Sequence, residues 1–405
     1  MGERQPLALY VHIPFCKSRC AYCDFNTYAG LSALLAPYVR ALVREIRMWG
    51  ERLADGGPPI PIRTLYIGGG TPSLLPPSLL AQVLEACREA FHLLPDAEVS
   101  LEANPETVDQ ESLTALRTLG VNRLSLGLQS THADELRLLG RRHTFEDAVR
   151  AVQAARQAGF DNLNLDLIYG LPGQRVNRWR RSLERVLALE PEHLSAYSLT
   201  VEEGTPLYDR VAAGRLPPPD PDRAAEMYEL AEGMLAGAGY VHYEISNWAR
   251  LSQPSSGGPA PPSVREPSPF VCRHNLVYWR NEPYLGVGAG AHSFLEGRRW
   301  HNVLAPAHYI ARLEGGALPI AQVEELSPEM AMAETMILGL RLLVEGVSCE
   351  GFRRCFGRHP LEQYGEAIEE MVGVGLLTVD GDRIRLTDRG RLLGNEVFVR
   401  FLPEG

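Results

Sequence analysis

The sequence predicts an α/β fold, a partial (β/α)6 barrel of the TIM type followed by a smaller C-terminal α+β domain of winged-helix type. Between residue 7 and about residue 239, short β-branched or aromatic runs alternate six times with longer segments of helical periodicity, as in βα units on a parallel sheet. Near the C-terminus, three helical patterns precede a hairpin. Six units are too few to close an eight-fold barrel, so an open barrel is expected.

The six expected strands each end in a turn, and an amphipathic helix follows each of them. The strands are expected at residues 8–14, 64–67, 98–102, 123–127, 162–168 and 193–199. The helices are expected at residues 34–52, 77–91, 110–119, 145–158, 178–189 and 223–235. Ligands of such folds bind at the carboxyl ends of the strands, so the functional site is expected there.

The chain is expected to divide into a barrel over residues 1–240, a connecting segment over 241–326 and a C-terminal domain over 327–405. Within the connecting segment, residues 251–269 hold six Pro, five Ser and two Gly, which predicts a solvated loop. The C-terminal segment carries nine Arg and thirteen acidic residues. This acidic balance disfavours DNA binding, and a substrate lid or a protein contact is the favoured role.

Composition narrows the class of protein further. The 405 residues carry a formal net charge of −10, which disfavours nucleic acid as the main partner. No apolar run is long enough for a membrane span, and the first residues lack the apolar core of a signal peptide. Seven cysteines, an odd number with three inside eight residues, do not resemble a disulfide framework. We therefore expect a cytoplasmic protein.

The strongest chemical signal is Cys16-x-x-x-Cys20-x-x-Cys23, directly after the first strand. A loop there can fold three thiolates around one inorganic centre, and an iron–sulfur cubane held by three cysteines keeps one iron open for another ligand. Structural zinc is an alternative, but it needs a fourth ligand, which His12 or Asp24 would have to supply. Three buried structural cysteines are a weaker alternative, because the residues between the first two are polar.

Other strand ends supply groups suited to a small charged ligand. Glycine-rich residues 68–72 allow close backbone approach, although such a turn is often only a turn. Glu102, Gln129 and Asp166 interrupt apolar strands, and each could instead have a partner in the barrel core. Arg141 could bind a carboxylate, or it could be a solvated surface charge.

Taken together, these motifs resemble the radical S-adenosylmethionine (SAM) superfamily and, within it, the oxygen-independent coproporphyrinogen III oxidase family. The resemblance rests on YVHIPFC with the two later cysteines, GGGTP, EANP, LGLQS and NLDLIYGLPGQ, in this order, and it covers nearly the whole chain. It implies a [4Fe-4S] cluster on Cys16, Cys20 and Cys23, whose open iron takes SAM. The SAM site that it implies is lined by Tyr10, Tyr22, Gly69, Gly70, Thr71, Glu102, Gln129, Arg141 and Asp166.

Two departures indicate the branch of the family. The oxidase has a further cysteine two residues after the third ligand, where this chain has Phe25, which argues against decarboxylase activity. In addition, residues 274–279 read HNLVYW and resemble the HNxxYW signature of the haem-chaperone branch. An imidazole beside aromatic rings can ligate haem iron, so His274 is the expected haem ligand. The alternative is a histidine satisfied by its neighbours on an aromatic-rich strand.

The resemblance therefore implies a cytoplasmic haem chaperone that carries the cluster and SAM and delivers haem to a haem-dependent protein, such as a respiratory enzyme. A homodimer and peripheral membrane contact through the recipient are further expectations, and no nucleic acid is expected as a partner. Two alternatives stay open. One is a radical SAM enzyme, acting on a porphyrinogen or as a methyltransferase-type relative that uses two SAM molecules. The other is a zinc-stabilised acidic binding protein.

Overall fold

A computed structural model describes residues 5–251 and 268–403 of the chain. Most of the expected loop at 251–269 therefore lies outside the described residues. The chain forms two compact units. Unit 1 comprises Met1–Met234, Pro283–Leu295 and Arg299–Val323, and unit 2 comprises Leu235–Glu282, Glu296–Arg298 and Glu324–Gly405. The three segments expected from the sequence are a different division, which stays a prediction.

Unit 1 is built on a mainly parallel sheet whose strand order is β14-β13-β12-β11-β1-β4-β5-β6-β7-β8. Neighbours from β1 to β8 all pair in parallel, which confirms the expected α/β class. The bounds of these six strands are β1 Leu7–Ile13, β4 Pro61–Gly69, β5 His92–Ala103, β6 Arg123–Gln129, β7 Leu163–Tyr169 and β8 His193–Ser198.

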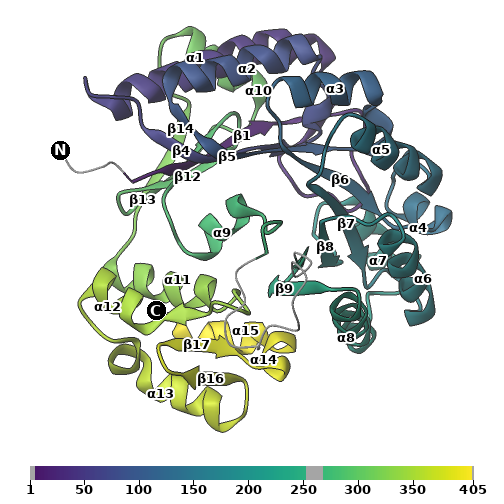
Figure 1. The fold of residues 1–405 in the computed structure, drawn as a ribbon, viewed down its shortest axis with the longest axis vertical. Helices are drawn as coiled ribbons and strands as arrows, with labels where there is room; N and C mark the ends of the chain where they lie inside the picture. The colour runs from purple at the N-terminus through teal and green to yellow at the C-terminus, as the bar shows by residue number, and fades with distance from the viewer. Residues whose placement is uncertain (1–4, 252–267, 404–405) are drawn as a thin grey trace, which may run out of the picture. The chain divides into compact units, whose positions relative to one another are not determined.

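Helices follow the strands and cover the outer face of this sheet (Figure 1). In α1, buried residues recur three and four apart, as at Tyr38, Leu42 and Glu45, so one side of the helix faces the sheet. Side chains of Asp109 and Thr144 cap the first turns of α3 and α5. The bounds are α1 Leu35–Ala54, α2 Pro77–Ala90, α3 Gln110–Thr118, α5 Phe145–Gln157, α6 Val176–Leu187 and α8 Pro221–Gly237.

Four further strands extend the sheet beyond β1, which the six-unit pattern does not predict. Strand β11 pairs in parallel with β1 and antiparallel with β12, so the added strands break the βα repeat. Several short elements are also not predicted from the sequence, because one or two helical turns show too little hydrophobic periodicity. These elements are β11 Tyr284–Val287, β12 His292–Leu295, β13 Arg298–Asn302, β14 Ile320–Glu325, α4 Ala133–Leu138, α7 Pro206–Ala212, α10 Pro306–Glu314 and the 3-10 turns Ser32–Leu34, Pro72–Leu74 and Pro105–Thr107.

Unit 2 has its own apolar core, which includes Met336, Phe352 and Ile384. The expected hairpin is confirmed, since β16 and β17 pair antiparallel around a turn with Gly381 in the left-handed region. With β15 they form a three-stranded sheet beside the helices. The elements are β9 Tyr240–Glu244, β10 Asn247–Arg250, α9 Arg273–Trp279, α11 Pro328–Gly339, β15 Val347–Ser348, α12 Cys349–Phe356, α13 Pro360–Gly373, β16 Leu377–Asp380, β17 Arg383–Leu386, α14 Asp388–Leu392, α15 Gly394–Phe398 and the 3-10 turn Val399–Phe401.

The HNLVYW segment is helical, in α9, so the aromatic-rich strand considered as an alternative is wrong.

Within residues 5–251 and 268–403, none of the helices combines the length and the apolar character of a membrane span.

Candidate functional site

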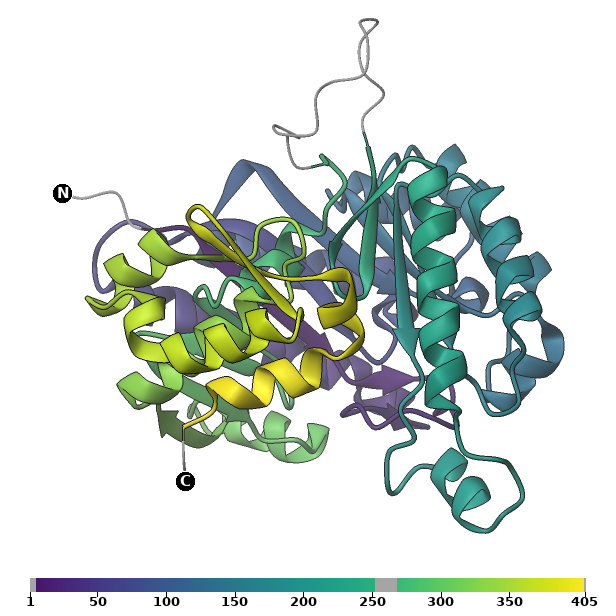
Figure 2. The same cartoon turned by 90° about the horizontal axis from the view of Figure 1, so that it is seen from below.

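The three cysteines of the motif lie on one loop at the carboxyl end of β1. Strand β2 (Phe15–Cys16) pairs in parallel with β3 (Tyr28–Ala29) and closes this loop. In α7, Leu207 N–H donates to the Ala21 carbonyl at 2.8 Å, and Figure 2 shows α7 at the same end of the unit as the loop. All three thiols are half-buried, and each has a polar side chain nearby. These groups are Thr71 Oγ1 at 3.7 Å from Cys16 Sγ, Arg141 Nη1 at 3.6 Å from Cys20 Sγ and Thr27 Oγ1 at 3.8 Å from Cys23 Sγ.

A chain of hydrogen bonds connects two of these sulfurs through Asn104. The Asn104 Nδ2 group donates to Thr71 Oγ1 at 3.0 Å, and Arg141 Nη2 donates to Asn104 Oδ1 at 2.5 Å. The same Nη2 donates to the Gly127 carbonyl at 2.7 Å. These hydrogen bonds join Thr71 after β4, Asn104 after β5 and Arg141 after α4 around the cysteine loop. Sequence reasoning did not single out Asn104, although it is the third residue of the EANP motif.

The glycine-rich turn after β4 lies directly on the cysteine loop. Gly69 has φ of +118°, and a Cβ there would lie 2.6 Å from the His12 ring. A Cβ on Gly70 would lie 2.6 Å from the Phe15 carbonyl oxygen and 3.0 Å from Cys16 Sγ. The Gly70 N–H donates to the Ile13 carbonyl at 2.8 Å, which holds the turn in place. The glycines are therefore required for this close approach.

Two buried carboxylates lie on strands of the same sheet, Glu102 on β5 beside the turn and Asp166 on β7. Glu102 accepts hydrogen bonds from Tyr66 Oη at 2.8 Å and from Gly69 N at 3.0 Å. Burial raises the pKa of Glu102 to about 7, and the charge of Asp166 adds to this rise. Burial also raises the pKa of Asp166, although Ser125 donates to it at 2.9 Å. Gly69 is among the residues expected to line the SAM site, and its amide here donates to Glu102.

The remaining predicted SAM residues surround the same strand ends. Tyr10 stacks on Tyr66, with ring centroids 6.3 Å apart. Gln129 adopts φ of +68°, unusual for a residue with a side chain, at a bulge that ends β6. Burial raises the pKa of Tyr22, and the neighbouring charge of Arg141 opposes this rise. The structure thus brings the predicted residues together at one end of the sheet.

Three thiols on one loop form a donor set that fits a [4Fe-4S] cluster. Both nitrogens of His12 are engaged, Nδ1 by Tyr10 Oη at 2.9 Å and Nε2 by the Asn26 carbonyl at 3.0 Å, so His12 is not placed as a fourth zinc ligand. Among the described residues, no three His, Cys, Asp or Glu side chains are grouped for a single metal ion. Three thiolates on a cubane bind three different irons, so they need not converge on one point.

The glycine-rich segment after β11 is anchored from the outer helices. Glu45 of α1 accepts from Gly288 N at 2.8 Å, from Asn302 Nδ2 at 2.7 Å and from Tyr309 Oη at 2.5 Å. Burial raises the pKa of Glu45 to about 7. A Cβ on Gly288 would lie 2.5 Å from the His12 carbonyl oxygen, so this segment also packs against β1.

In unit 2, His274 lies on α9 and is 1% exposed. Its Nε2 lies 2.9 Å from Tyr278 Oη, and the two rings meet edge to face at a centroid distance of 5.1 Å. The helix places these residues one turn apart, which is why the HNxxYW spacing brings them together. The imidazole is therefore held by its own motif.

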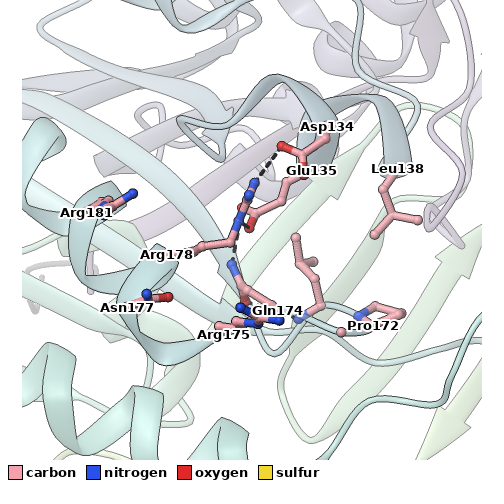
Figure 3. Close-up of a pocket in the computed structure, with 11 residues that line it drawn as sticks. Asp134, Glu135, Leu138, Pro172, Gln174, Arg175, Asn177, Arg178 and Arg181 are labelled. Atoms are coloured by element: carbon pink, nitrogen blue, oxygen red, sulfur yellow. Dashed lines mark hydrogen bonds and ion pairs between the residues drawn. The ribbon is translucent and has the colours of Figure 1, made fainter.

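A cavity of about 400 Å³ lies elsewhere in unit 1, where the LPGQ part of the last barrel motif meets α4 and α6. Figure 3 shows Arg178 reaching across it to Asp134 and Glu135. Burial opposes the charge of Arg178, but these two carboxylates raise its pKa. None of the predicted cluster or SAM residues lines this cavity.

Strand ends that gather three cysteines, a glycine-rich turn and buried carboxylates define a radical SAM protein. Residues 10–186 match the model of the radical SAM superfamily, and residues 326–393 match the HemN C-terminal domain. The fold is similar to that of coproporphyrinogen III oxidase (HemN) from Escherichia coli, with a TM-score of 0.81 and 24% identity over 98% of this chain and 90% of that one.

The chain belongs to the HemW family. It is 40% identical to the heme chaperone HemW of Mycobacterium tuberculosis, over 97% of this chain and 94% of the relative. It is 37% identical to the heme chaperone HemW of Bacillus subtilis, over 98% of this chain and 99% of the relative.

Proposed function

We propose that this protein is a haem chaperone that binds a [4Fe-4S] cluster on Cys16, Cys20 and Cys23 together with SAM. The observation that carries the cluster is the cysteine loop, where each thiol has a polar side chain nearby and Gly70 packs against Cys16. Near-complete coverage by relatives named heme chaperone HemW supports haem as the cargo. Phe25, which is 64% exposed, stands where the oxidase has a further cysteine.

The residues around the cluster have separable tasks. When bound, the cluster supplies an electron to SAM through its open iron. Thr71 and Arg141 donate toward the sulfurs of Cys16 and Cys20, and the Thr27 hydroxyl can donate to Cys23 when that sulfur is a thiolate, which stabilises negative charge on the sulfurs. Glu102 and Asp166 are suited to the amine or the ribose hydroxyls of SAM. Both carboxyl groups have raised pKa values, so a cationic group beside them would favour their charged forms.

His274 is the proposed haem ligand, and Tyr278 is the hydrogen-bond partner of its ring. The Nε2 atom faces the Tyr278 hydroxyl, so ligation through Nε2 requires this hydrogen bond to open. The proposal also places the protein in the cytoplasm, with haem-dependent proteins such as respiratory enzymes as recipients. Homodimerisation and membrane contact through a recipient are further parts of it.

The test begins with anaerobic reconstitution and an assay of iron and sulfide. We expect four irons per chain from [4Fe-4S] chemistry, and loss of the cluster in Cys16→Ser, Cys20→Ser and Cys23→Ser. Cys355→Ser is the control, because Cys355 is exposed and outside the loop. A chain that stays free of iron would contradict the cluster.

Haem titration by Soret absorbance then compares the wild type with His274→Ala. We expect tight haem binding by the wild type and a weaker, spectrally altered complex in the variant. Unchanged binding would reject His274 as a ligand. Turnover of coproporphyrinogen by the reconstituted sample would favour the enzyme over the chaperone.

A further inference from the structure

We infer that unit 1 carries a second haem-binding surface, with His301 as the axial ligand and His292 beside it. The surface lies on strands β11, β12 and β13, and none of its residues was among the predicted site residues. The inference rests on the proposed function, because it takes haem as the cargo.

Strand register places the two imidazoles side by side. Asn302 N–H donates to the Ala291 carbonyl at 3.0 Å, so His301 and His292 are opposite each other across β12 and β13. Their ring centroids are 5.2 Å apart. Side chains alternate along a strand, so Asn302 points to Glu45 and the outer helices, while His301 points to the opposite face.

Both imidazoles are in a state suited to ligation. The Nδ1 atom of His301 lies 3.1 Å from the Asn302 carbonyl oxygen, which can only accept, so Nδ1 carries the proton and the neutral ring keeps its lone pair on Nε2. A second ring nitrogen held by a carbonyl is the usual support of a metal-bound histidine. Partial burial of the ring, followed by the neighbouring His301 and Arg299, lowers the pKa of His292, which favours the neutral form of this ring. His292 is exposed and His301 is half-exposed.

The same face offers contacts for a flat anionic ring system. Tyr284 and Phe294 are register partners on β11 and β12, with ring centroids 6.5 Å apart, and both are half-exposed. The Arg299 guanidinium lies over the Phe294 ring at 5.7 Å. Aromatic rings pack on a porphyrin plane, and a guanidinium pairs with carboxylates such as the haem propionates.

This face is continuous with the cluster end of the sheet. Gly286 is the register partner of Tyr10, and the pairing of β11 with β12 sets it opposite His292. Because Gly286 has no side chain, β11 contributes none to the register row that joins Tyr10 and His292. His292 is also close enough to His12 to lower its pKa, after the larger effect of burial.

Haem iron fits this pair better than a free metal ion. Structural zinc takes four protein ligands, whereas the described residues offer no third His, Cys, Asp or Glu grouped with these two. Haem iron brings four porphyrin nitrogens and needs only an axial imidazole. Two imidazoles on one face of the sheet reach the same side of the macrocycle, so the other side of the iron stays open for a recipient's ligand.

The test titrates haem into the full reconstituted chain carrying His274→Ala, which removes the ligand proposed in unit 2. We expect remaining haem binding with an imidazole-type ferric spectrum. Adding His301→Ala should weaken this binding at least tenfold and abolish the imidazole signature in electron paramagnetic resonance. His308→Ala is the matched control, an exposed histidine on α10 of the same unit, and it should leave binding unchanged.

Each outcome separates the two proposals. If His274→Ala alone removes all haem binding, the second surface is rejected while the proposed function stands. If the wild type binds no haem, both fail. Iron-free protoporphyrin should bind without dependence on His301, and Zn²⁺ alone should bind weakly. Zinc binding tighter than haem binding, and lost in His292→Ala, would overturn the inference in favour of an ion site. His292→Ala is also a second variant that should fold normally, because it alters an exposed side chain.

Discussion

The guanidinium of Arg141 lies 3.6 Å from the sulfur of Cys20, although 121 positions separate the two residues in the chain. Burial disfavours the charge of Arg141, but Tyr22 and Cys20 raise its pKa, so the cation persists beside the cluster loop. A fixed positive charge there stabilises the more negative, reduced form of a cluster. It also secures Asn104, which donates to Thr71 on the far side of the loop.

Replacing Arg141 tests this arrangement. Arg141→Met keeps an unbranched apolar stem but removes the charge and the donors. We expect a more negative reduction potential of the reconstituted cluster and roughly tenfold weaker SAM binding, since a charged hydrogen bond contributes about 1.5–3 kcal/mol. Spectroelectrochemical titration and SAM binding measure both quantities. The exposed neighbour gives the control Arg142→Met. Equal potentials in the two variants would exclude an electrostatic role.

Gly70→Ala tests the contact between the glycine-rich turn and the cysteine loop. The added Cβ would lie 2.6 Å from the Phe15 carbonyl oxygen, so backbone must shift and Cys16 with it. We expect a large loss of bound iron after reconstitution. Gly233→Ala, in α8 with open space around the added Cβ, should keep full iron and gain up to about 1 kcal/mol of stability. Normal iron content in Gly70→Ala would show that the turn is not constrained.

The raised pKa of Glu45 predicts that the free energy of unfolding depends on pH. Its pKa is raised from 4.5 in the unfolded chain to about 7 in the fold, so the folded state binds the proton more tightly. Its contribution is therefore fully present below pH 4.5 and is lost as the pH rises to 7, a change on the order of 3 kcal/mol.

The measurement is chemical denaturation at several pH values between 4.5 and 7. Glu45→Gln, which cannot ionise, should flatten this part of the stability profile. Glu51→Gln, an exposed position on the same helix, should leave the profile as in the wild type. Parallel profiles for wild type and Glu45→Gln would contradict the raised pKa.

Tyr278→Phe tests whether the Tyr278 hydroxyl hinders haem ligation by His274 or orients the imidazole for it. The variant removes the hydroxyl that lies 2.9 Å from His274 Nε2. If ligation requires this hydrogen bond to open, haem affinity should rise by about fivefold, because a typical hydrogen bond contributes about 1 kcal/mol. Soret titration measures the change. Tyr364→Phe, elsewhere in unit 2, is the control. A fall in affinity would instead assign the hydroxyl an orienting role toward the bound state.

Local sequence patterns were sufficient to predict the βα alternation, the three-cysteine motif and a set of candidate site residues. Hydrophobic periodicity and turn residues are local properties, and parallel strands necessarily bring their carboxyl ends to one edge. Cys16, Gly69, Glu102 and Asp166 could therefore be assigned to one site before their contacts were known.

Which of these groups contact one another follows from the folded arrangement of the strands. Asn104 bridges Thr71 and Arg141, and β11 to β14 join the β1 edge, because both depend on register between segments far apart in the chain. Local patterns carry no information on that register. For the same reason His292 and His301 cannot be recognised as neighbours from the sequence. The pairing of β12 and β13 places them on one face of the sheet.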